Sequence, residues 1–591
     1  MQSLVRALFI VFCVSPAAHG QVFDEQFDHW PVNLKINGRI VIARSLEHPE
    51  LLKPLLPEDA REVHVVVDPE STLEDLDSYL NLFKPDVTIP DQKTEEAPAE
   101  TSADVAGKDE DPTDESEDDE ARFAITMSQL GDPLGSDDLA EADVVLFLGS
   151  DEADASVMQQ YHEELKKAVD NGNTLVAIGP LIEALGVSYT SDDQQFPSQQ
   201  PGLGLLPDCI IEAEFDGQPR AKNRLLSLLA AAPRCVGIGL ADNTALILSG
   251  RKMLVSGDGS ATAMLMANER QPLRVQTIVP AASRRRYSTA SLLDLTEWRR
   301  DAIDRTLPQF PPEQPRRPYV ENGTLVIVGG GGMPDGLMDQ IVELAGGREE
   351  ARMVYIPCSE REDVGERQST VESWKRMGVQ HATFIHTKDR VQANEDEEFL
   401  KPLREATGLW FGGGRQWNFA DSYYGTTAHK LMKEVLQRGG VIGGSSAGAS
   451  IQARYLARAT PIGNFDIMAP GYERGGLGFI SGVAIDQHFS QRGRQKDLTQ
   501  LVNRYPQMLG IGIDEATAII VQQSEAEVVG RGRVFFYDRN RPVFPDRPDY
   551  IALPAGSKFD LDRREVLVDT SGEGNTPDEE SENASADDAD R

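Results

Sequence analysis

Short apolar segments alternate with longer segments of mixed polarity through the C-terminal half of the chain. The predicted buried strands are Leu325–Val328, Met353–Ile356, Gly408–Phe411 and Gly440–Ile442. The predicted helices are Pro334–Ala345, Thr427–Arg438 and Gln495–Arg504. This alternation indicates a mostly parallel sheet covered by helices on both faces. Ligands of such sheets bind at the carboxyl ends of the strands, so functional residues are expected there.

The N-terminal half repeats this pattern in the same order. The matching pairs are Asn37–Ile42 with Asn322–Ile327, Ala60–Val66 with Ala351–Ile356, Ala142–Gly149 with Ala406–Gly413, Gly202–Leu205 with Gly476–Phe479, and Gly237–Leu240 with Gly510–Ile513. We therefore predict an α/β protein of two tandem doubly wound, mostly parallel-sheet domains that arose by duplication. Chance similarity between two α/β domains is the alternative.

Composition divides the chain into six parts. Residues 1–20 carry one positive charge, a short apolar core and small residues, which predicts a signal peptide and export to the periplasm or beyond the cell. The first domain is predicted over 33–300, with a disordered acidic insertion at 86–122. A proline-rich linker at 307–318 precedes the second domain, 320–555, and an acidic disordered tail covers 571–591.

The segment Val441–Ala449 has the sequence of a nucleophile elbow. Ser446 follows two β-branched residues and is surrounded by glycine, serine and alanine. Only small neighbours fit a sharp strand-to-helix turn that presents a serine. The backbone N–H of Ala447 is predicted to stabilise an oxyanion, with Gly413 or Gly414 supplying a second N–H. A glycine-rich turn without chemistry is the alternative.

Two later segments add a base and an acid. His488 and Glu515 each follow a short apolar strand, at the reactive edge of an α/β sheet. His488 can accept the proton of Ser446, and Glu515 can orient the imidazole. Asp514 adjoins Glu515, but alternation along a strand sends neighbouring side chains to opposite faces, so only one of the two is expected to reach His488.

Residues 320 to 555 resemble cyanophycinase and its relatives in serine peptidase family S51. The segments that carry the resemblance are Gly443–Ala449, Asp486–Arg494 and Gly512–Ala518. The family fold is similar to class I glutamine amidotransferases, and the resemblance implies the catalytic triad Ser446, His488 and Glu515. It also implies that Gln416, Asp486, Gln487, Arg492 and Arg494 line the substrate pocket. Arginines suit carboxylates, and an aspartate suits a guanidinium or an amine.

Two positions depart from the family pattern in charge. Arg415 stands where an acid or an amide is usual, and Asp497 stands where a basic residue is common. Both changes reverse a charge at the expected rim of the pocket, so they put the substrate in doubt rather than the triad.

The first domain lacks the chemistry. Its elbow region, Val176–Leu181, has no serine, while Glu214 and Asp242 fall where His488 and Glu515 stand in the second domain. We therefore predict a degenerate, non-catalytic copy.

Composition restricts cofactors and partners. The net charge of −38 argues against a nucleic-acid partner, because phosphate binding needs clustered lysine and arginine. The sequence has no CxxC, HExxH or histidine cluster, so we predict neither a metal nor another cofactor. The apolar run of the predicted signal peptide is too short for a permanent membrane anchor, and no other segment is long enough to cross a bilayer. A homodimer is left open.

The resulting hypothesis is an exported serine hydrolase of the cyanophycinase type. Its predicted substrate is cyanophycin (multi-L-arginyl-poly-L-aspartate) or a related aspartyl or isoaspartyl peptide, cleaved through an acyl-enzyme. Two alternatives remain: a dipeptidase for Asp-initiated peptides, and a non-catalytic binding or scaffold protein.

Overall fold

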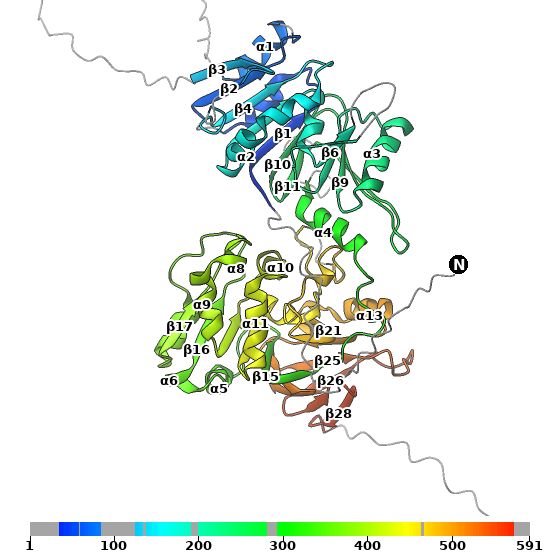
Figure 1. The fold of residues 1–591 in the computed structure, drawn as a ribbon. Coiled ribbons are helices and arrows are strands. Elements are labelled where there is room, and N and C mark those ends of the chain that lie inside the picture. Colours follow the sequence, from blue (N-terminus) through cyan, green and yellow to red (C-terminus); the bar gives the residue numbers. More distant parts are fainter. Residues whose placement is uncertain are drawn as a thin grey trace, which may run out of the picture.

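Two α/β domains, one from each half of the chain, are stacked end to end in the computed structural model (Figure 1). The structure describes residues 35–57, 60–71, 73–83, 124–133, 138–190, 199–280, 292–462 and 466–572. The predicted signal peptide, the whole of the predicted acidic insertion and the tail beyond 572 lie outside these residues.

The second domain is built on a nine-stranded sheet. Its strands, in spatial order, are β17 (His381–Phe384), β16 (Arg352–Ile356), β18 (Gly408–Phe411), β19 (Val441–Ser445), β15 (Val320–Val328), β23 (Thr517–Gln523), β24 (Glu525–Gly530), β27 (Lys558–Asp560) and β28 (Glu565–Val568). The first five are mutually parallel, and β23 begins the antiparallel part. The predicted strands are therefore present.

Helices cover both faces of this sheet, as a buried parallel sheet requires. Side chains alternate along β15: Val326 and Val328 pack on one face, and Leu325 and Ile327 on the other. The first face is covered by α5 (Leu337–Leu344) and α7 (Ser369–Arg376). The second face is covered by α9 (Glu397–Glu405) and α11 (Thr427–Gln437).

A five-stranded sheet completes the second domain. Its strands, in order, are β20 (Ala453–Tyr455), β21 (Ile480–Gln487), β22 (Leu509–Ile513), β25 (Arg533–Tyr537) and β26 (Ile551–Pro554). Helix α13 (Gln495–Arg504) packs Leu498, Leu501 and Val502 against it.

The first domain has an eight-stranded and a four-stranded sheet. The larger contains, in order, β14 (Leu292–Asp294), β11 (Lys252–Gly257), β10 (Thr244–Gly250), β1 (Ile36–Ala43), β5 (Thr174–Ile178), β4 (Val144–Leu148), β2 (Glu62–Val67) and β3 (Ala124–Gln129). The smaller contains β13 (Arg274–Ile278), β12 (Ala261–Leu265), β9 (Val236–Leu240) and β8 (Cys209–Glu212). The α-helices within this domain are α1 (Leu73–Leu80), α2 (His162–Asp170) and α3 (Pro219–Ala231).

Strand order is the same in the two domains. The series β3-β2-β4-β5-β1-β10-β11-β14 matches β17-β16-β18-β19-β15-β23-β24-β27, and β13-β12-β9-β8 matches β26-β25-β22-β21. The prediction of two tandem α/β domains is confirmed. Val63 pairs with Val144 as Met353 pairs with Gly408, so Val63 corresponds to Met353 in the repeat.

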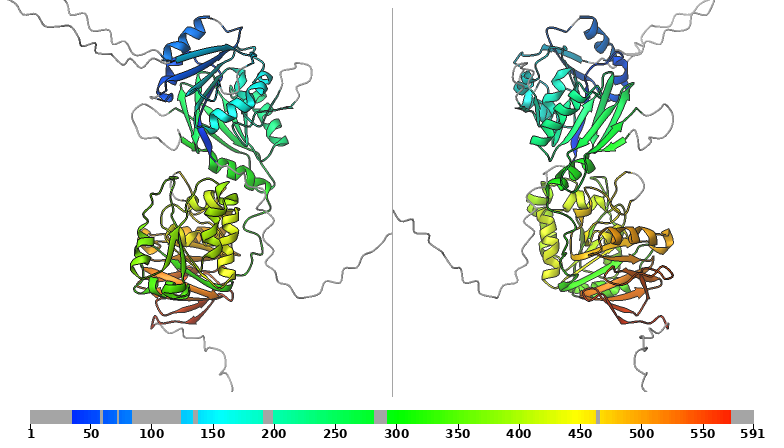
Figure 2. Two further views of the ribbon diagram at one scale, coloured as in Figure 1. Left: turned by 60° about the vertical axis from the view of Figure 1, so that its left-hand side comes forward. Right: turned by 90° about the vertical axis from the view of Figure 1, so that its right-hand side faces the viewer.

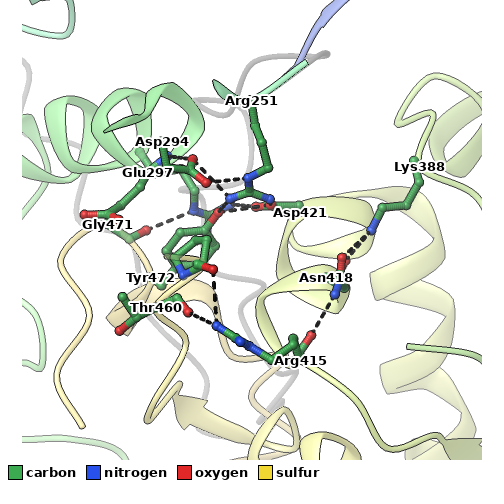
Figure 3. A network of polar contacts seen from close by, with 12 residues as sticks. Arg251, Asp294, Glu297, Lys388, Arg415, Asn418, Asp421, Thr460, Gly471 and Tyr472 are labelled. Carbon is green, nitrogen blue, oxygen red and sulfur yellow. Dashed lines mark hydrogen bonds and ion pairs between the residues drawn. The ribbon is translucent and has the colours of Figure 1, made fainter. Parts of the chain in front are cut away.

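Helix α4 (Leu295–Thr306) lies between the domains, where all views place it (Figures 1 and 2). Asp294 directly precedes this helix and accepts a hydrogen bond from Arg251 of the first domain at 2.5 Å. Arg251 also donates to Asp421 at 2.9 Å and to the Tyr472 hydroxyl at 2.7 Å. Its guanidinium also lies 3.9 Å from the centroid of the Trp417 ring. Figure 3 shows this network, which joins the two domains through a buried cation.

Replacing Arg251 with Met should lower the free energy of unfolding by about 3 kcal/mol, because it leaves the buried Asp294 carboxylate without its cation and removes one of the two arginines that pair with Asp421. Calorimetric unfolding is the measurement. Arg348→Met is the control, since its ion pair with Asp339 is exposed and should contribute less than about 1 kcal/mol. Equal effects of the two variants would contradict a structural role for the Arg251 network.

Candidate active site

Ser446 occupies a tight turn between β19 and the short helix α12 (Ala447–Ser450). Its φ of 57° lies in the left-handed region, which non-glycine residues rarely adopt. A side chain at Gly444 would overlap the carbonyl of Gly448, and one at Gly448 would overlap the carbonyl of Phe411. This crowding is the physical reason for the small residues around the serine.

Ser446, His488 and Glu515 form a continuous hydrogen-bonded chain. His488 Nε2 lies 2.9 Å from Ser446 Oγ, and His488 Nδ1 lies 2.6 Å from Glu515 Oε1. Asp514 turns away and accepts hydrogen bonds from the main-chain N–H groups of Ser490 and Arg533. The structure thus brings together the predicted nucleophile, base and acid, with Glu515 rather than Asp514 on the imidazole.

The three residues come from two sheets. Ser446 follows β19 of the nine-stranded sheet, whereas His488 and Glu515 follow β21 and β22 of the five-stranded sheet. From the sequence, all three residues were expected at one edge of a single sheet. The structure instead places the site where the edges of two sheets meet.

The end of β15 connects these two edges through the main chain. Carbonyl oxygens of Val328, Gly329 and Gly330 accept hydrogen bonds from the N–H groups of Ser446 at 3.0 Å, His488 at 2.8 Å and Ala516 at 2.8 Å, respectively. Each of the three donors is a proposed triad residue or its immediate neighbour.

Glycine is required in this loop because the triad lies directly on it. Gly330 has a φ of 97°, and a Cβ there would overlap the His488 ring. A Cβ on Gly331 would press on the Glu515 side chain in the same way. Sequence reasoning missed this loop, although the four successive glycines 329–332 directly after a strand were an available signal.

Burial keeps the His488 imidazole in its neutral form. Desolvation lowers the pKa of His488, and nearby Arg492 and Arg494 act in the same direction, while the hydrogen bond to Glu515 opposes them. A neutral imidazole can accept a proton from Ser446, which is what a general base needs at neutral pH.

The two candidate oxyanion glycines face different neighbours. A Cβ built on Gly413 would lie 3.6 Å from Ser446 Cβ, so Gly413 borders the serine. Gly414, with a φ of 151°, packs on Cys358. The geometry therefore favours Gly413 over Gly414 as the partner of Ala447.

Cys358 is a second nucleophilic side chain close to this loop. Its thiol donates to the carbonyl of Arg415 at 3.0 Å, and burial raises its pKa to about 12. The thiol therefore stays protonated, and Ser446 is the better nucleophile. A cavity of about 480 Å³ beside Gly413 is lined by Tyr355, Pro357, Cys358, Ser359, Arg361, Asp363, Val364, Gly365 and Gln368.

Several predicted substrate-binding residues are engaged within the protein. Asp486 is fully buried, and its carboxylate accepts hydrogen bonds from Arg458 at 2.7 and 3.0 Å and from Arg494 at 2.9 Å. Arg494 also donates to the backbone and side-chain oxygens of Gln487. Substrate contact by Asp486, Gln487 and Arg494 stays a prediction. This conformation does not favour it, because the polar groups of these residues already bind groups within the protein.

The remaining pocket candidates differ in exposure. Gln416 is buried and donates to the carbonyls of Ala457 and Arg458. Arg492 is exposed next to His488 and is the candidate most open to a ligand.

The two departures from the family pattern also have partners. Arg415 donates to the carbonyl of Thr460 at 2.6 Å, and Asp497 accepts from Arg458 at 2.8 Å. Arg458, which sequence reasoning missed, thus bridges Asp486 and Asp497.

The corresponding region of the first domain contains different groups. Strand register places Gly179 at the position of Ser446, and its N–H donates to the Ala43 carbonyl as Ser446 donates to Val328. Glu214 lies 3.6 Å from Arg44, which also pairs with Asp151. Among the described residues of this region, no serine takes the elbow position.

If the glycine loop sets the triad, Gly330→Ala should reduce the catalytic efficiency for peptide hydrolysis at least about 100-fold by displacing His488. Gly332→Ala is the matched control: Gly332 also has positive φ, at 133°, but no atom lies within 4 Å of the position that a methyl group would take there. Initial rates and circular dichroism should be compared. A folded Gly330→Ala variant with control-level activity would refute the dependence.

The pH profile tests the state of His488. Since its pKa lies below the usual value of about 6.5, activity should be constant at neutral pH and fall only under more acidic conditions, as the imidazole becomes protonated. Arg492→Gln should move this acidic limb to higher pH, and Glu515→Gln to lower pH. The measurement is the pH dependence of kcat/KM, and shifts in the opposite directions would contradict the assignment.

No helix in the described part of the chain is long and apolar enough to cross a bilayer.

Known proteins resemble the second half of the chain. The family model for peptidase family S51 matches residues 324–529. The cyanophycinase of Geminocystis herdmanii (strain PCC 6308) is 30% identical over 226 residues, covering 37% of this chain and 82% of that protein. The cyanophycinase of Trichormus variabilis is 27% identical over 241 residues, covering 37% of this chain and 79% of that protein.

Among solved structures, a peptidase from an acI-B1 actinobacterium is 22% identical, with a TM-score of 0.31, covering 40% of this chain and 97% of that chain. The cyanophycinase matches span most of those relatives' length, and with the family match they show that the chain belongs to peptidase family S51 and is a serine-type peptidase.

Proposed function

We propose that the protein is an exported cyanophycinase-type hydrolase that uses Ser446, His488 and Glu515 as its catalytic triad. The observation that carries this proposal is the unbroken hydrogen-bonded chain from Glu515 through His488 to Ser446. Because the protein belongs to a serine peptidase family, we interpret these hydrogen bonds as those of a catalytic triad. This interpretation disfavours the alternative of a non-catalytic scaffold protein.

The reaction follows from these contacts. Ser446 Oγ attacks the scissile carbonyl carbon while His488 Nε2 takes the hydroxyl proton. The N–H groups of Gly413 and Ala447 receive the oxyanion of the tetrahedral intermediate. The C–N bond then breaks, and His488 passes its proton to the leaving amine. Water, deprotonated by His488, attacks the acyl-enzyme and releases the acid and free Ser446.

The proposed substrate is cyanophycin, and the expected product is the β-Asp-Arg dipeptide. Each unit of this polymer carries a free carboxylate and a guanidinium. Exposed Arg492 next to His488 suits the carboxylate, and Asp363 in the cavity beside Gly413 suits the guanidinium. The similarity to cyanophycinases supports the same substrate class.

A dipeptidase for Asp-initiated peptides is the second candidate, and the two ion pairs of Asp486 favour it. The Asp486 carboxylate, expected to receive a guanidinium or an amine, is occupied by Arg458 and Arg494. A peptide without arginine side chains does not need that carboxylate.

We propose that the first domain is a degenerate duplicate without catalytic activity. Its equal strand order supports duplication, and Gly179 at the serine position supports the loss of chemistry. Export rests on residues 1–20 of the sequence alone.

Cyanophycin digestion tests the proposal. Purified residues 21–591 should release β-Asp-Arg, detected by mass spectrometry, and Ser446→Ala should release at least about 1,000-fold less because the nucleophile is gone. Ser450→Ala, four residues along on α12, is the control and should retain activity.

Two results would count against this account. Release of β-Asp-Arg by folded Ser446→Ala would refute the triad. Cleavage of Asp-initiated dipeptides without cleavage of cyanophycin would select the second candidate.

A further inference from the structure

A cavity of about 570 Å³ lies between the two domains, apart from the triad. The first domain contributes walls from β1, β10 and β11, and the second domain contributes Glu360, Lys388 and Trp417. Its volume is in the usual range for a small-ligand site.

The lining of this cavity is strongly basic. It contains five cationic side chains and one carboxylate: Lys35, Arg39, Arg251, Lys252, Lys388 and Glu360. The chain as a whole has a net charge of −38, so the charge of the cavity lining is opposite in sign to that of the whole chain. Pro54, Leu55, Ile247 and Leu254 supply apolar surface between the charges. Such a surface favours an anion with a carbon framework.

These cations differ in how far the protein neutralises them. Arg251 is matched by the carboxylates of Asp294 and Asp421. Lys388, in contrast, donates to the backbone and side-chain oxygens of Asn418, which are neutral acceptors. Burial lowers the pKa of Lys388 to about 8, and the charges of Lys35 and Arg251 add to this effect although Asp421 opposes it. A bound carboxylate would therefore stabilise the ammonium.

The cavity is connected to the catalytic loop by hydrogen bonds. Lys388 donates to the Asn418 side chain at 3.1 Å, and that side chain donates to the carbonyl of Arg415 at 3.1 Å (Figure 3). Arg415 directly follows Gly413 and Gly414, which border Ser446 and Cys358. A ligand bound to Lys388 would thus contact a residue that is hydrogen-bonded, through Asn418, to the loop of Gly413 and Gly414.

We propose that this interdomain cavity binds the carboxylates of an aspartate-rich peptide, with Lys388 and Lys252 as its principal contacts from the two domains. The choice of an aspartate-rich peptide over other anions rests on the proposed function in the form that takes an aspartyl peptide as substrate, because each cyanophycin unit also carries a guanidinium. The first domain then acts as a binding element for the acidic part of the substrate or product.

Calorimetric titration of the full chain with tetra-aspartate tests this proposal, with the Ser446→Ala substitution present throughout to prevent turnover. Lys388→Gln should weaken binding about tenfold and Lys252→Gln about threefold, because each removes one charged contact. Lys558→Gln is the matched control, since its ion pair with Glu525 is elsewhere on the surface. Tetraglycine should not bind.

No binding of tetra-aspartate, or binding unaffected by Lys252→Gln, would overturn the proposal. Lys252 is exposed, so its variant remains decisive if Lys388→Gln does not fold. Lys252 belongs to the first domain. A weaker affinity of the Lys252→Gln variant for tetra-aspartate therefore distinguishes binding in this cavity from binding at Ser446. The titration requires no hydrolysis, so its failure is distinguishable from a failure of the proposed activity.

Discussion

The arrangement of the active site depends on the main chain at the end of β15. Three successive carbonyls, of Val328, Gly329 and Gly330, hold the N–H groups of Ser446, His488 and Ala516. Since Ser446 follows one sheet and the other two follow a second sheet, this loop fixes the distance between the nucleophile and its base. Glycine at Gly330 and Gly331 lets the imidazole and the carboxylate lie directly on the backbone. Backbone conformation, more than any side-chain contact, therefore sets the geometry of the proposed triad.

The first domain shows what the same framework looks like without this constraint. Gly179 follows its β5, and the Gly179 N–H still donates to the carbonyl of Ala43 at the end of β1, at 3.0 Å. The loop after β1 begins with Arg44 and Ser45, which carry side chains where the second domain has Gly329 and Gly330. Arg44 instead pairs with Asp151 and Glu214. The framework is kept, but the space for an imidazole against the backbone is not. The first domain instead contributes most of the lining of the basic cavity that it shares with the second domain.

Much of this molecule was predictable from sequence because local patterns carry it. Buried strands such as Leu325–Val328 and the small residues around Ser446 are visible in a single segment, and the resemblance to a family linked Ser446 to His488 and Glu515. Contacts between distant segments were not visible. Arg458 meets Asp486 from a loop at φ 59°, and Arg251 meets Asp421 across the domain boundary. Both pairs depend on the packing of separate sheets, which no periodicity along the chain encodes. The same reason hid the role of Gly329–Gly332.

Covalent labelling tests whether the end of β15 places His488 to activate Ser446. The full chain would be treated with a fluorophosphonate, and the modified peptide and the labelling rate read by mass spectrometry. Ser446 should be modified, at a rate that falls at least about 100-fold in His488→Ala because the serine loses its base. Modification of another residue, or an unchanged rate at Ser446 in that variant, would contradict this role of His488.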